Sequence, residues 1–157
     1  MLICLLLALA SCGFHLRGTV ELSSELLEMA LIDARPATDI APELRRGLER
    51  QGVTLVDGAP MVLQLHTENY ERRVLSVDTA GRAQEYGLSY TVSFSLRETD
   101  GSIWLGGESV SVSRDLSFDA TAVLSSSSEE RQLKAEMIRD AVNSILRRLG
   151  RASAPAE

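Results

Sequence analysis

The longest regular pattern in the chain is an alternation of apolar residues with small or polar ones over residues 84–96. Side chains alternate between the two faces of a β-strand, so this pattern predicts a strand with one buried face. The even positions supply the apolar face, which consists of Tyr86, Leu88, Tyr90, Val92, Phe94 and Leu96. Asp100-Gly101 then predicts a hairpin turn. The return strand, near residues 103–118, has an apolar face made of Trp104, Val110, Val112, Leu116 and Phe118.

Shorter patterns predict three elements in front of this hairpin. Residues 26–32 form a brief apolar run, which is typical of a buried strand. Asp39 is placed to cap a helix over about residues 40–51, and Gly52 is a favourable stop. Residues 61–66 alternate again and predict a second strand.

The C-terminal part of the chain predicts a second helix. Ser127 and Glu130 have the spacing of a capping box at its start. An apolar stripe at helical spacing follows: Leu133, Met137, Ile138, Ala141, Val142, Ile145 and Leu149. Residues 150–157 are expected to form a flexible tail.

The order strand, helix, strand, strand, strand, helix predicts an α+β fold. We expect a two-layer sandwich in which two helices pack on one face of a four-stranded mixed sheet. The opposite face of the hairpin would then carry hydroxyl side chains: Ser89, Thr91, Ser93, Ser109, Ser111 and Ser113. Solvated sheet faces usually carry charged residues, so this face suits a polar partner interface. An equally good alternative is that serine and threonine simply tolerate strands and face water.

The first residues predict a lipid anchor. Residues 1–10 are apolar but too short to cross a bilayer, which needs about 20 residues. They fit the core of a cleaved signal peptide, and Leu9-Ala10-Ser11-Cys12 has the pattern of a bacterial lipobox. Since Cys4 would leave with the signal, lipidation accounts for Cys12, the one cysteine of the mature chain. The expected organisation is a signal peptide over 1–11, one domain over 12–149 and a tail over 150–157.

Two details qualify this anchor. No Lys or Arg precedes the apolar core, so either the start codon is placed too far downstream or the signal is unusually short. Gly13 stands where an aspartate would favour retention in the inner membrane, which favours the outer membrane, with the domain on its periplasmic side.

Charge narrows the choice of partners. The net charge of −6 argues against nucleic acid, whose binding depends on basic surfaces. An anionic lipid would need a local basic patch, and Arg72, Arg73 and Arg82 are the candidates beside the loop between the second and third strands. The stronger alternative is a solvated loop balanced by Glu71 and Asp78.

No residue pattern indicates catalysis, a metal or a cofactor. His15 and His66 are far apart and have no second cysteine beside them, whereas a metal needs convergent ligands. The serines form no Gly-x-Ser-x-Gly nucleophile turn, and a phosphate-binding glycine loop is missing. We therefore expect a protein that is not an enzyme. Glu68 and Glu71 lie on polar faces, and we expect both carboxylates to be solvated.

Three segments carry a resemblance to a known family. Residues 12–18 read Cys-Gly-Phe-His-Leu-Arg-Gly, and residues 81–86 and 114–118 are similar to two strand segments of the same family. The chain resembles the lipopolysaccharide-assembly lipoprotein family LptE of Gram-negative bacteria. The resemblance implies a plug in the lumen of the outer-membrane β-barrel LptD, which assists the folding of LptD and binds lipopolysaccharide.

Two other functions are alternatives to this role. A lipid-binding accessory lipoprotein of an ABC-type envelope transporter would share the anchor and a domain of this kind. A periplasmic hydrolase is disfavoured because no nucleophile and base are paired in the sequence.

Overall fold

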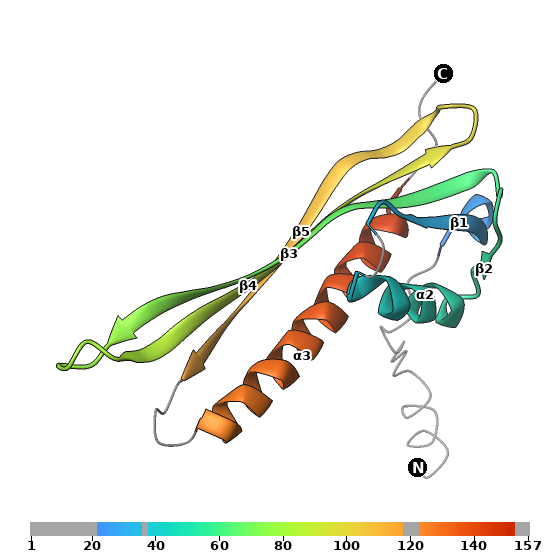
Figure 1. Ribbon diagram of the computed structural model, residues 1–157. Coiled ribbons are helices and arrows are strands. Elements are labelled where there is room, and N and C mark those ends of the chain that lie inside the picture. Colours follow the sequence, from blue (N-terminus) through green and yellow to red (C-terminus); the bar gives the residue numbers. More distant parts are fainter. Residues whose placement is uncertain (1–21, 36–37, 118–122, 153–157) are drawn as a thin grey trace, which may run out of the picture.

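The computed structural model describes residues 22–35, 38–117 and 123–152, with the backbone alone for residues 123–125 (Figure 1). A short 3-10 turn, η1 (Ser24–Leu26), precedes β1 (Glu28–Asp33) and α2 (Ile40–Arg50). The strands β2 (Thr54–Leu55), β3 (Met61–Val77), β4 (Ala83–Glu98) and β5 (Ile103–Ser117) follow, and α3 (Val123–Leu149) comes last.

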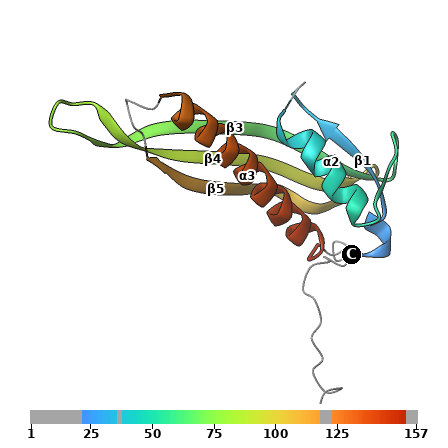
Figure 2. The same ribbon diagram turned by 90° about the horizontal axis from the view of Figure 1, so that it is seen from below.

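The sheet has the order β2-β1-β3-β4-β5. β1 runs parallel to β2 and β3, whereas β3, β4 and β5 are antiparallel neighbours. Figure 2 shows α2 and α3 side by side on one face of this sheet. The expected two-layer α+β sandwich with a mixed sheet is confirmed. The expected number of strands is wrong, because a fifth strand of only two residues, β2, pairs with β1.

The core lies between the helices and the apolar face of the hairpin. The even positions of β4 from Leu88 to Leu96 are all buried, as their alternation predicted. The helices cover them with buried side chains from α2 (Ile40, Leu44, Leu48) and α3 (Met137, Ala141, Val142, Ile145, Leu146, Leu149). A Cβ atom on Gly47 of α2 would lie only 2.9 Å from a methyl carbon of Val142, so a glycine permits this close approach of the helices.

Both predicted helix caps are wrong in detail. α3 begins at Val123, so Ser127 lies inside the helix, and Glu130 accepts hydrogen bonds from β3 instead of capping. Asp39 does stand at the N-cap position of α2, but its side chain makes no capping hydrogen bond. Its carboxylate faces Lys134 of α3, because a tertiary ion pair competes successfully with the local cap. Gly52 has φ 83° directly after α2, in agreement with the predicted stop.

The strands differ from expectation in length. β3 continues to Val77, well beyond the predicted end at His66, because it pairs with β4 over its full length. Register shifts near the start of β5 bring Trp104 and Leu105 both against the core. Phe118 lies outside the described residues, as do Cys12 and the predicted signal peptide. The expected domain and tail boundaries therefore stay predictions.

Candidate functional site

The sheet face opposite the helices gathers all six of the predicted interface residues. Within this hydroxyl face, three pairs stand directly opposite each other on β4 and β5: Ser89 and Ser113, Thr91 and Ser111, Ser93 and Ser109. The hydroxyls of Thr91 and Ser111 are 3.0 Å apart, within hydrogen-bond distance. All six side chains are at least partly exposed. The hydroxyl face is thus a continuous surface of small uncharged groups.

β3 extends this surface on one side. Thr67 lies opposite Ser93, and their hydroxyl oxygens are 2.5 Å apart. Farther along, the ring nitrogen Nε2 of His66 lies 2.8 Å from the hydroxyl of Ser95. His66 thus points to the same side of the sheet as Ser95. Charge enters at the border, where Glu71 stands opposite Ser89.

The three predicted basic residues do not converge. Arg72 and Arg73 lie within β3 and not in a flanking loop, and neighbouring strand residues point to opposite faces. Arg72 lies on the helix side, where its Nη1 is 2.8 Å from Glu130 and its guanidinium sits 4.5 Å from the ring centre of Tyr86. Arg82 lies at the hairpin turn and donates to Asp78 at 2.8 Å. The structure therefore places Arg72 and Arg73 on opposite faces of β3 and Arg82 at the turn that follows this strand.

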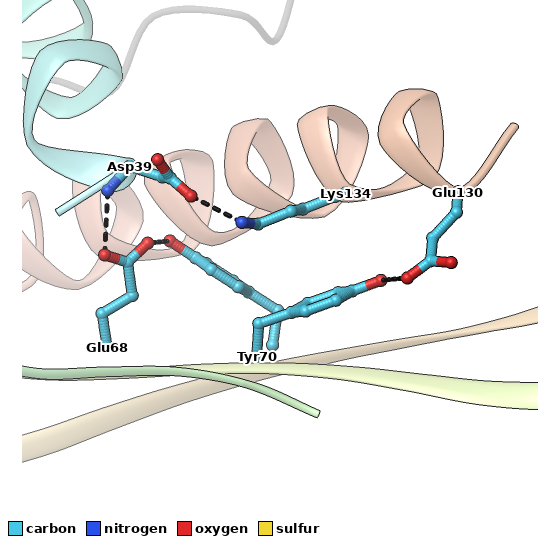
Figure 3. A network of polar contacts seen from close by, with 6 residues as sticks. Asp39, Glu68, Tyr70, Glu130 and Lys134 are labelled. Atoms are coloured by element: carbon cyan, nitrogen blue, oxygen red, sulfur yellow. Dashed lines mark hydrogen bonds and ion pairs between the residues drawn. The ribbon is translucent and has the colours of Figure 1, made fainter. Parts of the chain in front are cut away.

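A polar network lies between the sheet and the two helices (Figure 3). Glu68 of β3 accepts hydrogen bonds from the hydroxyl of Tyr90 and, at 2.9 Å, from the backbone N–H of Asp39. The carboxylate of Asp39 lies 2.5 Å from the amino group of Lys134. The carboxylate of Glu68 thus connects β3, β4 and the start of α2, and the carboxylate of Asp39 connects α2 to α3.

The network continues along α3. Tyr70 donates its hydroxyl to Glu130 at 2.9 Å, and Lys134 lies 5.1 Å from the centre of the Tyr70 ring. Since Arg72 also donates to Glu130, this carboxylate has two partners on β3. These polar contacts attach the part of α3 that precedes its buried stripe to β3.

This network was not predicted from the sequence. Glu68 was expected to be solvated, which is wrong: its side chain is partly buried and accepts two hydrogen bonds. A signal existed in the continued alternation of β3, which places Glu68, Tyr70 and Arg72 on the face toward the helices once one extra residue is allowed near His66. The partners of these residues are remote in sequence, so the alternation alone names none of them.

The network makes alkaline stability sensitive to Tyr70. Burial and the hydrogen bond to Glu130 raise the pKa of Tyr70 to about 12, and burial raises the pKa of Tyr90 as well. A neutral group with a raised pKa contributes its stability below the ordinary value of 10.0 and loses it as the pH passes about 12. Tyr70→Phe is expected to lose less stability than the wild type between these two pH values. Urea midpoints of the wild type and the variant, measured at pH 10.0 and at about pH 12, would check this. Equal losses in the two proteins would contradict the raised pKa of Tyr70.

Within the described residues, no helix is long and apolar enough to span a membrane. In the same part of the chain, no three His, Cys, Asp or Glu side chains gather in an arrangement that suits a metal ion.

The comparison with known families agrees with this arrangement of strands and helices. A family model described as LptE, lipopolysaccharide-assembly, matches residues 28–149, which run from β1 to the end of α3. The chain belongs to the LptE family. The resemblance found in the sequence is thereby confirmed. Proteins of this family are lipoproteins of lipopolysaccharide assembly and not enzymes, which also confirms the expectation of a non-enzymatic role.

Individual relatives support the family. A lipopolysaccharide-assembly lipoprotein LptE from Photorhabdus laumondii is 31% identical over 101 residues, which cover 62% of this chain and 56% of that protein. The chain thus spans little more than half the length of this relative. The LptE protein of Pectobacterium atrosepticum is 26% identical, and the match covers 89% of this chain and 77% of the relative.

Solved structures of lipoproteins share the fold of this chain. A solution structure of a lipoprotein B from Nitrosomonas europaea has a TM-score of 0.73 and 26% identity, and the match covers 88% of this chain and 90% of that one. The crystal structure of rare lipoprotein B from Shewanella oneidensis has a TM-score of 0.71 and 28% identity, with coverage of 79% and 94%.

Proposed function

We propose that the protein is an outer-membrane lipoprotein, anchored through Cys12, that serves as plug and assembly partner of the LptD β-barrel. In this role it helps to deliver lipopolysaccharide to the outer leaflet. Membership of the LptE family supports a role in lipopolysaccharide assembly, and the lipobox supports the lipid anchor at Cys12. The family gives no support to the alternative role beside an ABC-type transporter.

The hydroxyl face is the observation that carries the barrel partnership. Within the described residues, one whole side of the β4–β5 hairpin has no helix packed on it, and its six hydroxyl positions carry no charged side chain. Small hydroxyls allow another surface to approach closely and offer both donors and acceptors of hydrogen bonds. Interfaces that bury few charges avoid the cost of desolvating them. A barrel wall lined with polar side chains fits such a face.

The proposal that this protein binds lipopolysaccharide is supported by its family and not by a cluster of arginines. Arg72 has a carboxylate partner on the helix side, and Arg82 has one at the turn. Binding through Arg72, Arg73 and Arg82 together stays a prediction, and it would require the ligand to contact both sides of the hairpin.

Affinity purification from outer membranes tests the proposed function directly. The tagged full-length protein should co-purify with LptD in a stable complex that mass spectrometry identifies. Recovery of inner-membrane transporter components in place of LptD would overturn the proposal.

The anchor has a separate test. Cys12→Ala removes the only cysteine of the predicted mature chain, so the variant should lose its acyl chains and much of it should leave the membrane fraction. Two or more acyl chains are needed for stable anchoring, with about 0.8 kcal/mol for each buried methylene. Intact-mass measurement of the exported wild type checks the modification. An unmodified Cys12 in that measurement would refute the anchor.

A further inference from the structure

β5 is the end strand of the sheet on the hairpin side. No other strand in the described part of the chain pairs with its outer side. The opposite end of the sheet is β2, which has only two residues. Short end strands are a common protection against unwanted pairing, whereas a long end strand offers a row of free backbone groups. The two edges of this sheet therefore differ in what they present to a partner.

Backbone hydrogen bonds at the hairpin turn show which groups of β4 point toward β5. The N–H of Glu98 donates to the carbonyl of Ser102 at 2.8 Å, while the N–H of Thr99 donates in the other direction, to Pro60 at 2.8 Å. Directions alternate along an antiparallel strand, so the even residues of β4 face β5. Register shifts between β4 and β5 add residues to β5 and leave this alternation on β4 intact.

The same alternation fixes the free groups of β5. Val110 and Val112 stand opposite Val92 and Tyr90, so their backbone groups face β4. The residues between and beside them, Ser109, Ser111 and Ser113, therefore direct their N–H and C=O groups to the open side.

This edge lacks the usual protections over five residues. The segment Ser109–Ser113 reads Ser-Val-Ser-Val-Ser, without a charged residue or a proline. A bulge before Glu108 and the charged pair Arg114 and Asp115 bound it on either side. Natural sheets use charges, prolines and bulges to block edge pairing. Here such features stand at both ends of the segment and leave its middle open.

We propose that the β5 edge at Ser109–Ser113 binds an extended segment of a partner polypeptide, which adds to the sheet as a further strand. Only another extended backbone matches a row of alternating free N–H and C=O groups. The added segment should carry small aliphatic side chains on the helix side, next to Val110 and Val112. It should carry polar side chains on the other side, where it would continue the hydroxyl face. The inference holds whichever surface covers that face.

A second copy of this chain does not fit the same edge. α3 reaches the helix side of β5 at both ends of the segment, through the ion pairs of Asp140 with Arg114 and of Arg148 with Glu108. Pairing of two β5 edges about Ser111 would place two such helices beneath adjacent strands. Strands pair about 4.8 Å apart, whereas packed helices need about 8–10 Å between their axes. A single strand without its own helix layer avoids this clash.

Amide hydrogen exchange of the full chain tests the site. The probe is a blocked synthetic peptide of alternating valine and threonine with a lysine at each end. Its addition should slow exchange at Ser109, Ser111 and Ser113 by about tenfold or more, while the amides of Val110 and Val112 stay protected throughout. Peptide binding that protects other amides instead, or no binding, would overturn the proposal. Protection that appears without peptide and grows with protein concentration would indicate a second copy and would also overturn it.

A pair of variants at one position separates the backbone from the side chain. Ser111→Pro removes an N–H that makes no bond within the sheet and adds a ring on the open side, so peptide affinity should fall about tenfold or more. Ser111→Ala keeps the N–H and should bind the peptide within about twofold of the wild type. Equal affinity of the proline variant and the wild type would refute the edge site. If Ser111→Pro fails to fold, the exchange pattern of the wild type still decides.

Discussion

Phe94→Ala is expected to lower the free energy of unfolding by about 3–5 kcal/mol, and Met137→Ala by about 2–5 kcal/mol. Both side chains are 0% exposed and belong to one core cluster, with Phe94 on the central hairpin and Met137 on α3. Truncation removes apolar contacts and leaves a cavity that the surrounding sheet and helix cannot fill completely. Urea denaturation of the protein, followed by circular dichroism, measures both losses.

Polar positions on the same elements provide matched controls. Asn143 lies on the exposed side of α3, and Ser93 lies on the hydroxyl face of β4. The control variants are Asn143→Ala and Ser93→Ala. Neither change removes core volume, so each should alter the free energy of unfolding by no more than about 0.5 kcal/mol. Losses of equal size in the core and control variants would contradict the faces assigned to β4 and α3.

The central hairpin was predictable because one physical rule governs it. Every second residue of β4 from Leu88 to Leu96 is buried under the helices, so burial imposes the alternation directly on the sequence. β2 was not predictable by the same rule, because two residues cannot show a period. The start of α3 was misplaced because the spacing of Ser127 and Glu130 imitates a cap, while the helix continues backward to Val123.

The hydroxyl face and the polar network also differ in how far the sequence predicts them. The hydroxyl face follows from strand alternation and a hairpin register, both of which are local. The polar network depends on pairs such as Lys134 with Asp39, which lie 95 residues apart in the chain. Arg72 and Arg73 show a different limit: they are adjacent in sequence, and this very adjacency within a strand sends them to opposite faces.

The double variant Ser93→Glu with Ser111→Glu is expected to fold normally and to lose its LptD partner. Both positions lie on the hydroxyl face, away from the core, so the buried residues of β4 are untouched. Against a barrel wall the new carboxylates would have to give up water without a cationic partner. An unpaired buried charge either costs several kcal/mol or shifts its pKa, and either effect should weaken the complex severely.

The same charge placed elsewhere tests whether the location matters. Ala135→Glu with Asn143→Glu adds two carboxylates at exposed positions of α3, on the other layer of the sandwich. This control variant should co-purify with LptD at the wild-type level, whereas the hydroxyl-face variant should not. Urea midpoints of both variants establish that they fold. If the folded hydroxyl-face variant retains LptD and the α3 variant loses it, the helices and not the hydroxyl face contact the barrel, because only the position of the added charge differs between them.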